Sequence, residues 1–120
     1  MKFGICYCYW SKDWEGTDYP QTIARARKCG FDVLEIFYGR LLDMAQTEVD
    51  EIKAACKEYD VELYCCGGFD KEHDLTQKDP AARAHAIEKA KEIIKAASRV
   101  GSRNFSGINY SQWCNFDNPL

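Results

Sequence analysis

The sequence has no cluster of lysine or arginine and no long hydrophobic run. Its 16 basic and 19 acidic side chains give a net charge of −3 and are mixed along the chain. Proteins that bind a phosphate backbone need a basic face that displaces counterions, so we expect no nucleic-acid partner. The longest apolar stretch, residues 4–10, is far shorter than the roughly 20 residues that span a bilayer and lacks a signal-peptide pattern. We therefore expect no membrane partner and a cytoplasmic location.

Paired zinc-ligand and disulfide patterns are absent, although the chain has seven cysteines. These are Cys6, Cys8, Cys29, Cys56, Cys65, Cys66 and Cys114. Their number is odd and no export signal accompanies them, so a disulfide framework is not expected. One C-x-C, one adjacent pair and three single cysteines do not make a structural zinc site, and we predict no bound metal. Cys29 and Cys56 lie at helical positions among alanines, which suggests small buried hydrophobic residues.

Strand-like and helix-like stretches alternate with short spacers, a pattern typical of a parallel α/β sheet. Apolar runs predict strands at residues 2–8, 33–37, 62–66 and 104–108. Helical spacing of apolar residues predicts helices at residues 19–29, 47–59 and 80–100. Thr47 is a suitable N-cap for the second helix, and Asp79 followed by Pro80 suits the start of the third. The third helix has the longest apolar stripe, which we expect to face the core: Ala84, Ile87, Ala90, Ile93, Ile94 and Ala97.

The order β-α-β-α-β-α-β takes about 30 residues per unit, and eight such units make the roughly 250 residues of a (β/α)8 barrel. With 46% apolar and 29% charged residues, 120 residues should fold around one core and form one domain at most. A doubly wound sheet would normally finish with a helix over its last strand, and no helical pattern follows residue 108. We therefore predict an α/β fold in which residues 1–120 form the N-terminal half of a TIM barrel.

Sites in parallel sheets lie at the carboxyl ends of the strands, where aromatic residues and glycines predominate in this sequence. The side chains expected there come from Cys6, Cys8, Trp10, Trp14, residues 37–40, 66–69 and 107–113. Aromatic walls beside glycines suit a small polyhydroxylated ligand. The tryptophans could equally cover the top of the core, and the sequence leaves both interpretations open.

Groups for catalysis are few. Of the two histidines, His85 is interpreted as a solvated helix residue and His73 as a loop residue. Glu35 is the carboxylate inside an apolar strand, and we expect it to be paired or hydrogen-bonded. No sequence feature forces Cys66 or Cys8 to meet His73 as a nucleophilic pair. No catalytic residue is therefore predicted in this chain.

Several stretches in register resemble one enzyme family. They are residues 1–5, 9–10 and 30–36 (GFDVLEI), Trp14, Cys65-Cys66-x-Gly68 with the loop to Asp79 and Arg83, and Phe105-x-Gly107 up to Trp113. Together they resemble the N-terminal half of the ketose 3-epimerases, that is, the D-tagatose and D-psicose (allulose) 3-epimerases of the xylose isomerase-like TIM barrels. The resemblance covers the whole chain.

This resemblance implies a metal-dependent enzyme, usually with Mn²⁺, that epimerises a free ketose at C3. A cation on the C2 carbonyl acidifies the C3 proton, and two glutamates remove and return it through an enediolate. In the family, the metal ligands are those two glutamates, an aspartate and a histidine, all from the second half of the barrel. We therefore expect this chain alone to be inactive and to bind no Mn²⁺.

The resemblance also implies which residues contact the sugar. Cys66 matches a substrate-contacting position, Trp14 and Trp113 match aromatic wall positions, and Gly107 matches a glycine at the end of the fourth strand. Cys6 falls where relatives carry phenylalanine or tyrosine, which predicts a larger pocket.

Two other interpretations compete with an epimerase half. In one, the chain is a non-catalytic half-barrel module whose exposed strand edges are covered by self-association or by a separate C-terminal half. In the other, it is a small flavodoxin-like or thiol-redox domain, which would need a phosphate loop or a C-x-x-C motif; neither occurs.

Overall fold

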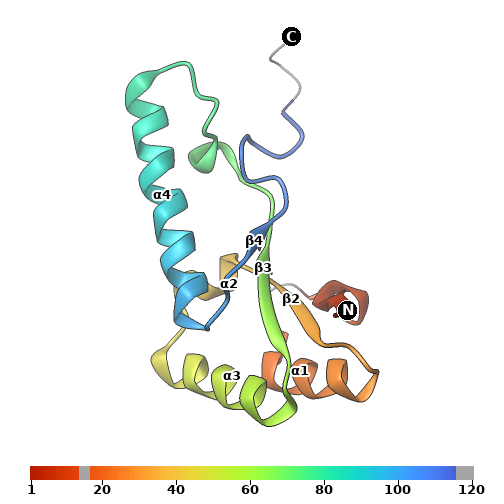
Figure 1. Ribbon diagram of the computed structural model, residues 1–120. Helices are drawn as coiled ribbons and strands as arrows, with labels where there is room; N and C mark the ends of the chain where they lie inside the picture. The colour runs from red at the N-terminus through yellow and green to blue at the C-terminus, as the bar shows by residue number, and fades with distance from the viewer. Residues whose placement is uncertain (14–16, 116–120) are drawn as a thin grey trace.

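A computed structural model describes residues 1–13 and 17–115 of the chain. Its strands are β1 (Gly4–Cys6), β2 (Val33–Phe37), β3 (Glu62–Cys66) and β4 (Phe105–Ser106). Its α-helices are α1 (Tyr19–Lys28), α2 (Gly39–Leu42), α3 (Gln46–Tyr59) and α4 (Pro80–Arg99), and two 3₁₀ turns are η1 (Tyr7–Tyr9) and η2 (Lys71–His73). Figure 1 shows α1 and α3 side by side below the sheet and α4 rising beside β3 and β4.

The four strands are parallel and lie in chain order, β1-β2-β3-β4. Consecutive order is the arrangement of a (β/α)8 barrel, whereas a doubly wound sheet reverses direction at a switch point. The predicted half-barrel fold is confirmed. The two central strands have the predicted bounds, 33–37 and 62–66.

The outer strands are shorter than predicted. β1 has three residues and gives way to the turn η1, and β4 has two residues and stops before Gly107, whose φ is +106°. Within the described residues, β1 and β4 each pair with one neighbouring strand, whereas β2 and β3 pair on both sides. Fewer backbone hydrogen bonds therefore hold the outer strands extended, and they are shorter.

The helix starts follow local hydrogen bonding. The Asp79 side chain accepts from the backbone N–H groups of Ala81 and Ala82, so the predicted start of α4 is confirmed. The predicted Thr47 cap is wrong, because α3 begins one residue before it, at Gln46. There the Glu48 carboxylate accepts from the Ala45 N–H at 3.2 Å and satisfies that donor in place of a hydroxyl cap.

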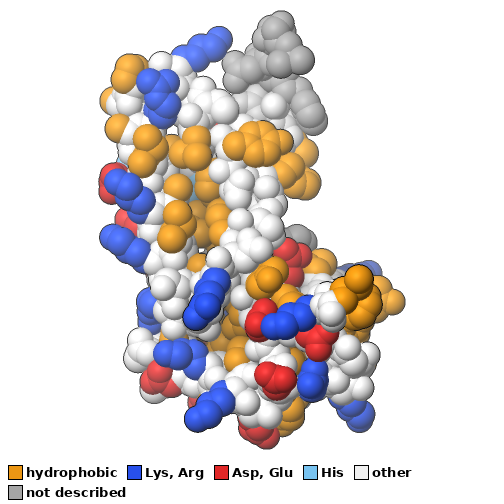
Figure 2. Space-filling view, viewed as in Figure 1, with side chains coloured by type: hydrophobic (Ala, Val, Ile, Leu, Met, Phe, Trp, Pro, Cys, Tyr) orange, Lys and Arg blue, Asp and Glu red, His pale blue; other side chains and the backbone are white. Residues whose placement is uncertain are grey.

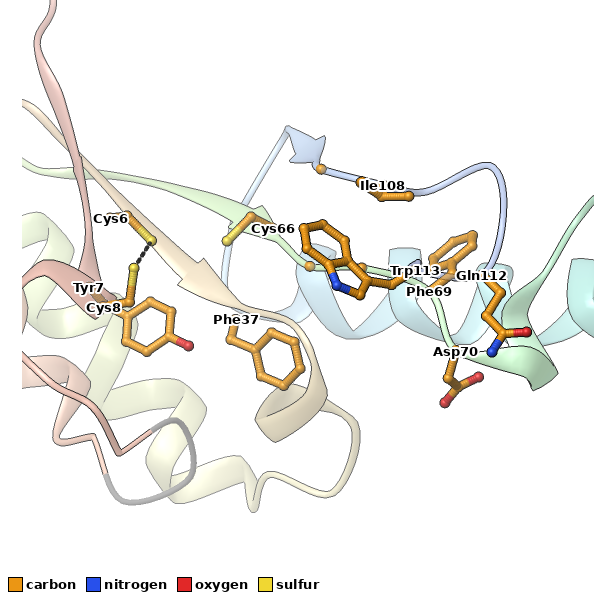
Figure 3. Close-up of a pocket in the computed structure, with 13 residues that line it drawn as sticks. Cys6, Tyr7, Cys8, Phe37, Cys66, Phe69, Asp70, Ile108, Gln112 and Trp113 are labelled. Atoms are coloured by element: carbon orange, nitrogen blue, oxygen red, sulfur yellow. Dashed lines mark hydrogen bonds between the residues drawn. The ribbon is translucent and has the colours of Figure 1, made fainter. Parts of the chain in front are cut away.

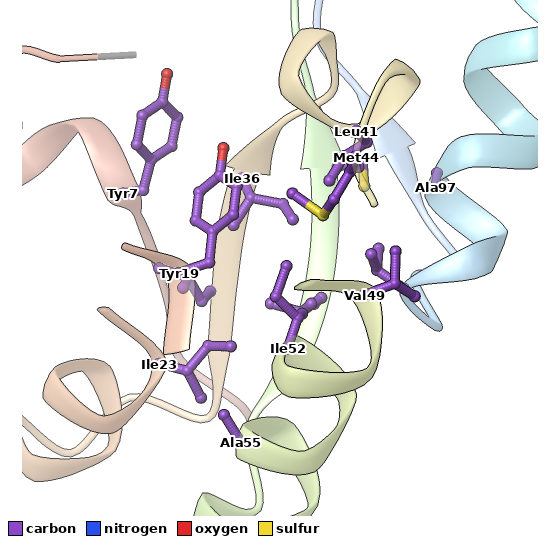
Figure 4. Close-up of a cluster of buried hydrophobic side chains, with 14 of the residues drawn as sticks. Tyr7, Tyr19, Ile23, Ile36, Leu41, Met44, Val49, Ile52, Ala55 and Ala97 are labelled. Carbon is purple, nitrogen blue, oxygen red and sulfur yellow. The ribbon is translucent and has the colours of Figure 1, made fainter. Parts of the chain in front are cut away.

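The main core lies between the sheet and its helices. Leu34 and Ile36 of β2 and Leu63 and Cys65 of β3 are buried on the face that packs against the helices. Figure 4 shows helix side chains converging on this face, among them Ile23 of α1, Val49 and Ile52 of α3, and Ala97 of α4. The opposite face carries residues that are only partly buried: Cys6, Glu35, Phe37, Tyr64 and Cys66.

Part of the predicted α4 stripe does not face the core. Ile93 and Ala97 are buried, but Ile87 is 43% exposed and Ile94 is 58% exposed. These two isoleucines lie seven residues apart and so share one flank of the helix. The spacing correctly indicated a wide apolar surface, but only one side of it is covered, chiefly by η2 and α2.

The expectation that Cys29 and Cys56 are buried holds in part for Cys56 and is wrong for Cys29. Cys56 is partly buried, and burial raises its pKa to about 11. Cys29 is exposed, because it is the C-cap residue of α1 and lies beyond the last buried turn. Within the described ranges no helix has the length and apolarity needed to cross a membrane.

Candidate functional site

A cavity of about 560 Å³ lies at the carboxyl ends of the strands (Figure 3). Its walls come from Cys6, Tyr7, Cys8, Phe37, Cys66, Gly67, Gly68, Phe69, Asp70, Gly107, Ile108, Gln112 and Trp113. All four strand ends contribute, because parallel strands finish at the same edge of the sheet. The lining is rich in rings and glycines, as the sequence predicted.

Two glycines bring the backbones after β3 and β4 into contact at the cavity. A Cβ atom on Gly107 would lie 2.4 Å from the carbonyl oxygen of Gly67, and the Gly107 φ of +106° is itself unfavourable for other residues. A Cβ atom on Gly67 would lie 2.4 Å from the Tyr38 ring. Glycine is therefore required at Gly107 for the two backbones to meet, and at Gly67 for the Tyr38 ring to pack against the backbone.

The described tryptophans occupy different environments. Trp113 is 58% exposed at the cavity, and a Cβ atom on Gly68 would come within 2.9 Å of its indole. Its backbone N–H donates to the Phe69 carbonyl at 2.7 Å, which fixes the loop that carries it. Trp10 instead packs against the main core and lies under the Arg25 guanidinium, 4.9 Å from the ring centre. Trp113 is thus a wall residue and Trp10 a packing residue, while Trp14 lies outside the described residues.

The cavity wall around Phe69 is supported by a buried histidine. His73 is 8% exposed, its ring lies against Phe69 and Tyr38, and its Nδ1 is 2.6 Å from Asp70 Oδ1. Burial alone would raise the pKa of Asp70, but the hydrogen bonds from His73 and from the Glu72 N–H hold that pKa below its ordinary value. His73 is engaged with Asp70, so the structure supplies no thiol–histidine pair through that nitrogen.

A second group of polar atoms lies on the open face of the sheet. One donor atom each from Cys6, Glu35 and Cys66 lies within 4.8 Å of the other two. Cys8 Sγ donates to Cys6 Sγ at 3.1 Å, and Ser106 Oγ donates to Glu35 Oε1 at 2.5 Å. The expectation that Glu35 is hydrogen-bonded is confirmed.

The Cys6 and Cys66 thiols are protonated at neutral pH, because their pKa values are raised. Burial, followed by the Cys8 thiol, raises the pKa of Cys6 to about 11. Burial, followed by the nearby Glu35 carboxylate, raises the pKa of Cys66 further still. A thiol acts as a nucleophile only as its thiolate, so these cysteines line the cavity as neutral groups.

The donor set does not fit Mn²⁺. That ion is suited by carboxylate, carbonyl and water oxygens, whereas two of the three converging donors in the described ranges are sulfur atoms. These residues therefore do not form a manganese site.

Four of the five predicted substrate-binding residues line the cavity: Cys6, Cys66, Gly107 and Trp113. Sequence reasoning missed Tyr7 and Asp70. The first strand is predicted to run to residue 8, whereas β1 ends at Cys6 and Tyr7 begins the turn at the cavity. Asp70 had a usable signal, because aspartate readily caps a short turn, and its carboxylate accepts from the N–H groups of Glu72 and His73.

The comparisons with known proteins agree on one family. Residues 23–113 match the family model described as xylose isomerase-like TIM barrel. The chain is 32% identical over 113 residues to a D-psicose 3-epimerase of Ruminiclostridium cellulolyticum and 31% identical over 115 residues to one of Enterocloster bolteae. Each match covers 94% of this chain and 38% of the relative, so the chain spans well under half of their length.

The structural comparison gives the same result. A crystal structure of D-psicose 3-epimerase with D-tagatose from Clostridium cellulolyticum H10 superposes with a TM-score of 0.89 at 30% identity, covering 100% of this chain and 42% of that one. An L-ribulose 3-epimerase superposes with a TM-score of 0.79 at 20% identity, over 99% of this chain and 39% of that one, and so supports the fold.

Proposed function

Because this chain belongs to the xylose isomerase-like TIM barrel family, we propose that it forms the N-terminal half of a ketose 3-epimerase-like isomerase and supplies one wall of its sugar cavity. The observation that carries this proposal is the cavity at four consecutive strand ends, lined by rings and glycines. It is supported by the D-psicose 3-epimerase relatives, which match over nearly all of this chain.

The cavity chemistry suits a free ketose. The rings of Phe37, Phe69 and Trp113 offer flat surfaces for the C–H faces of a sugar, and the glycines let the backbone approach closely. Asp70 and Gln112 are polar lining residues that would hydrogen-bond sugar hydroxyl groups. One carboxylate among so many apolar groups orients a ligand but provides no matched acid and base.

The proton-transfer groups are proposed to lie outside these residues. Moving a proton at the carbon beside a carbonyl requires a positioned base and a group that stabilises the enediolate. The cavity thiols of Cys6 and Cys66 are protonated, and Asp70 is paired with His73. The chain alone is therefore proposed to be inactive, and the Mn²⁺ implied by the family resemblance is proposed to be held elsewhere in the complete enzyme.

The open face of the sheet and one flank of α4 are proposed to be covered by the second half of the barrel. Figure 2 shows hydrophobic side chains gathered along α4 and toward the C-terminal segment, and the exposed ones include Ile87, Ile94, Tyr110 and Trp113. An exposed apolar strip beside a sheet edge is typical of an interaction surface. A second copy of the chain is the alternative partner, as in the non-catalytic module.

A chimaera tests this function. The matched N-terminal region of the R. cellulolyticum D-psicose 3-epimerase is replaced by this chain, and C3 epimerisation of D-psicose is measured with Mn²⁺. We expect turnover, and a loss of about tenfold in kcat/KM for Trp113→Ala, about 1.4 kcal/mol. Tyr9→Ala is the matched control, because Tyr9 is 78% exposed, does not line the cavity and lies outside the apolar strip proposed to meet the second half. A chimaera that folds by circular dichroism but responds equally to both substitutions would refute the proposed wall.

A further inference from the structure

We propose that Cys6, Cys66 and Glu35, with Cys8 as a fourth donor, form a binding site for a thiophilic divalent cation such as Zn²⁺. This site is separate from the manganese centre that the family resemblance implies, and it does not depend on the proposed epimerase function.

The sheet brings the donors together. Cys6 of β1 is paired with Glu35 of β2, and Cys66 ends the neighbouring strand β3. These three side chains emerge on the open face of the sheet, and their donor atoms lie within 4.8 Å of one another. Three adjacent strands thus hold them, which is firmer support than a loop would give.

The separation is close to what a tetrahedral ion requires. Zn–S bonds of about 2.3 Å and Zn–O bonds of about 2.0–2.2 Å place neighbouring ligand atoms roughly 3.5–3.8 Å apart. Donor atoms within 4.8 Å of one another reach this spacing by small side-chain rotations. Ser106 Oγ donates to one oxygen of Glu35, and such an outer hydrogen bond orients a ligating carboxylate.

Cys8 lies beside the three converging donors without being one of them, and it offers a fourth sulfur atom that a side-chain rotation would bring to the ion. Its Sγ lies 3.1 Å from Cys6 Sγ, and the two sulfur atoms point toward each other in Figure 3 while Cys66 Sγ faces them. Cys8 is exposed on η1, and all three cysteines line the cavity, so an ion can enter from solvent.

The donor chemistry selects the ion. Thiolates favour zinc and similar soft cations over manganese or magnesium. Each ligating thiol loses its proton to the buffer as its sulfur bonds to the metal, so binding exchanges protons for one cation and changes no oxidation state. A disulfide between Cys6 and Cys8 would instead need an oxidant. It would also not account for the short distances from Glu35 and Cys66 to Cys6.

The test titrates the reduced 120-residue chain with Cd²⁺ alone and follows the thiolate-to-cadmium charge-transfer absorption. We expect one ion per chain with a Kd of about 1 μM or tighter, competed by Zn²⁺ and not by Mn²⁺. Cys6→Ser and Cys66→Ser should each weaken binding by at least about tenfold, and Glu35→Gln by a smaller factor.

Exposed cysteines remote from the cluster provide the matched controls. Cys29→Ser and Cys114→Ser remove exposed thiols that do not line the cavity and should leave the affinity unchanged. If Cys6→Ser fails to fold by circular dichroism, the exposed Cys8→Ser variant replaces it, with an expected loss of charge-transfer intensity. Absence of a saturable band in the wild-type chain, or equal affinity in the Cys66→Ser and Cys29→Ser variants, would overturn the proposal.

Discussion

The two faces of the sheet differ in composition and in exposure. On the face that packs against the helices, Leu34 and Ile36 are fully buried and Leu63 is 5% exposed. On the opposite face, Glu35 and Cys66 are only partly buried and carry polar atoms. In a barrel the first face packs on the helices and the second faces the interior. Successive side chains of one strand therefore point alternately into the helix-packed core and toward the open face of the sheet.

The largest expected effect comes from the helix-facing side. Ile36→Ala should lower the free energy of unfolding by about 4 kcal/mol, because it removes a fully buried side chain from a close-packed core. Cys66→Ala, on the open face of the adjacent strand, should cost less than about 1 kcal/mol. Urea unfolding followed by circular dichroism measures both. Equal costs at the two positions would show that the faces are not distinct in the folded chain.

A smaller effect is expected where the loops meet. Gly107→Ala should destabilise the chain by about 2 kcal/mol, because its Cβ atom would clash with the Gly67 carbonyl oxygen at a φ of +106°. Gly101→Ala isolates the backbone contribution, since its φ is +83° but nothing lies within 4 Å of the added atom. That control should cost about 1 kcal/mol. If Gly101→Ala proves the costlier change, the close approach at the cavity is wrong.

The smallest effect concerns acid stability. The pKa of Asp70 is lower in the folded chain than its ordinary value of about 3.9. Its contribution to stability is therefore complete above that value and is lost as pH falls through the folded pKa. The Asp70 side chain is 65% exposed, so solvent screening limits the contribution to less than about 1 kcal/mol.

Asp70→Asn measures that contribution directly. The variant should be less stable than the wild type near neutral pH, and the difference should shrink in urea unfolding experiments as the pH falls below the ordinary carboxyl pKa of about 3.9. A difference that persists unchanged at low pH would mean that Asp70 acts through its shape and not through its charge.

Sequence reasoning succeeded where local pattern and pairing agree. The central strands at 33–37 and 62–66 were predicted with correct bounds because each is hydrogen-bonded on both sides. The prediction that four residues lie together at the cavity is confirmed, because parallel strands end at one edge of the sheet: Cys6, Cys66, Gly107 and Trp113.

The rest depends on contacts that spacing does not encode. The helical spacing of Ile87 and Ile94 predicts an apolar stripe but does not show which side of α4 the neighbouring elements cover. The contact of His73 with Asp70 depends on the path of a loop, and the convergence of Cys6 on Glu35 depends on side-chain rotamers.

The most direct test of the account is deuterium exchange at C3 of D-psicose, followed by NMR in D₂O with Mn²⁺ present. We propose that this chain supplies the cavity wall and that the second half of the barrel supplies the proton-transfer groups. We therefore expect no deuterium at C3 with the 120-residue chain alone, and incorporation with the folded chimaera. Incorporation at C3 catalysed by the chain alone would contradict this proposal.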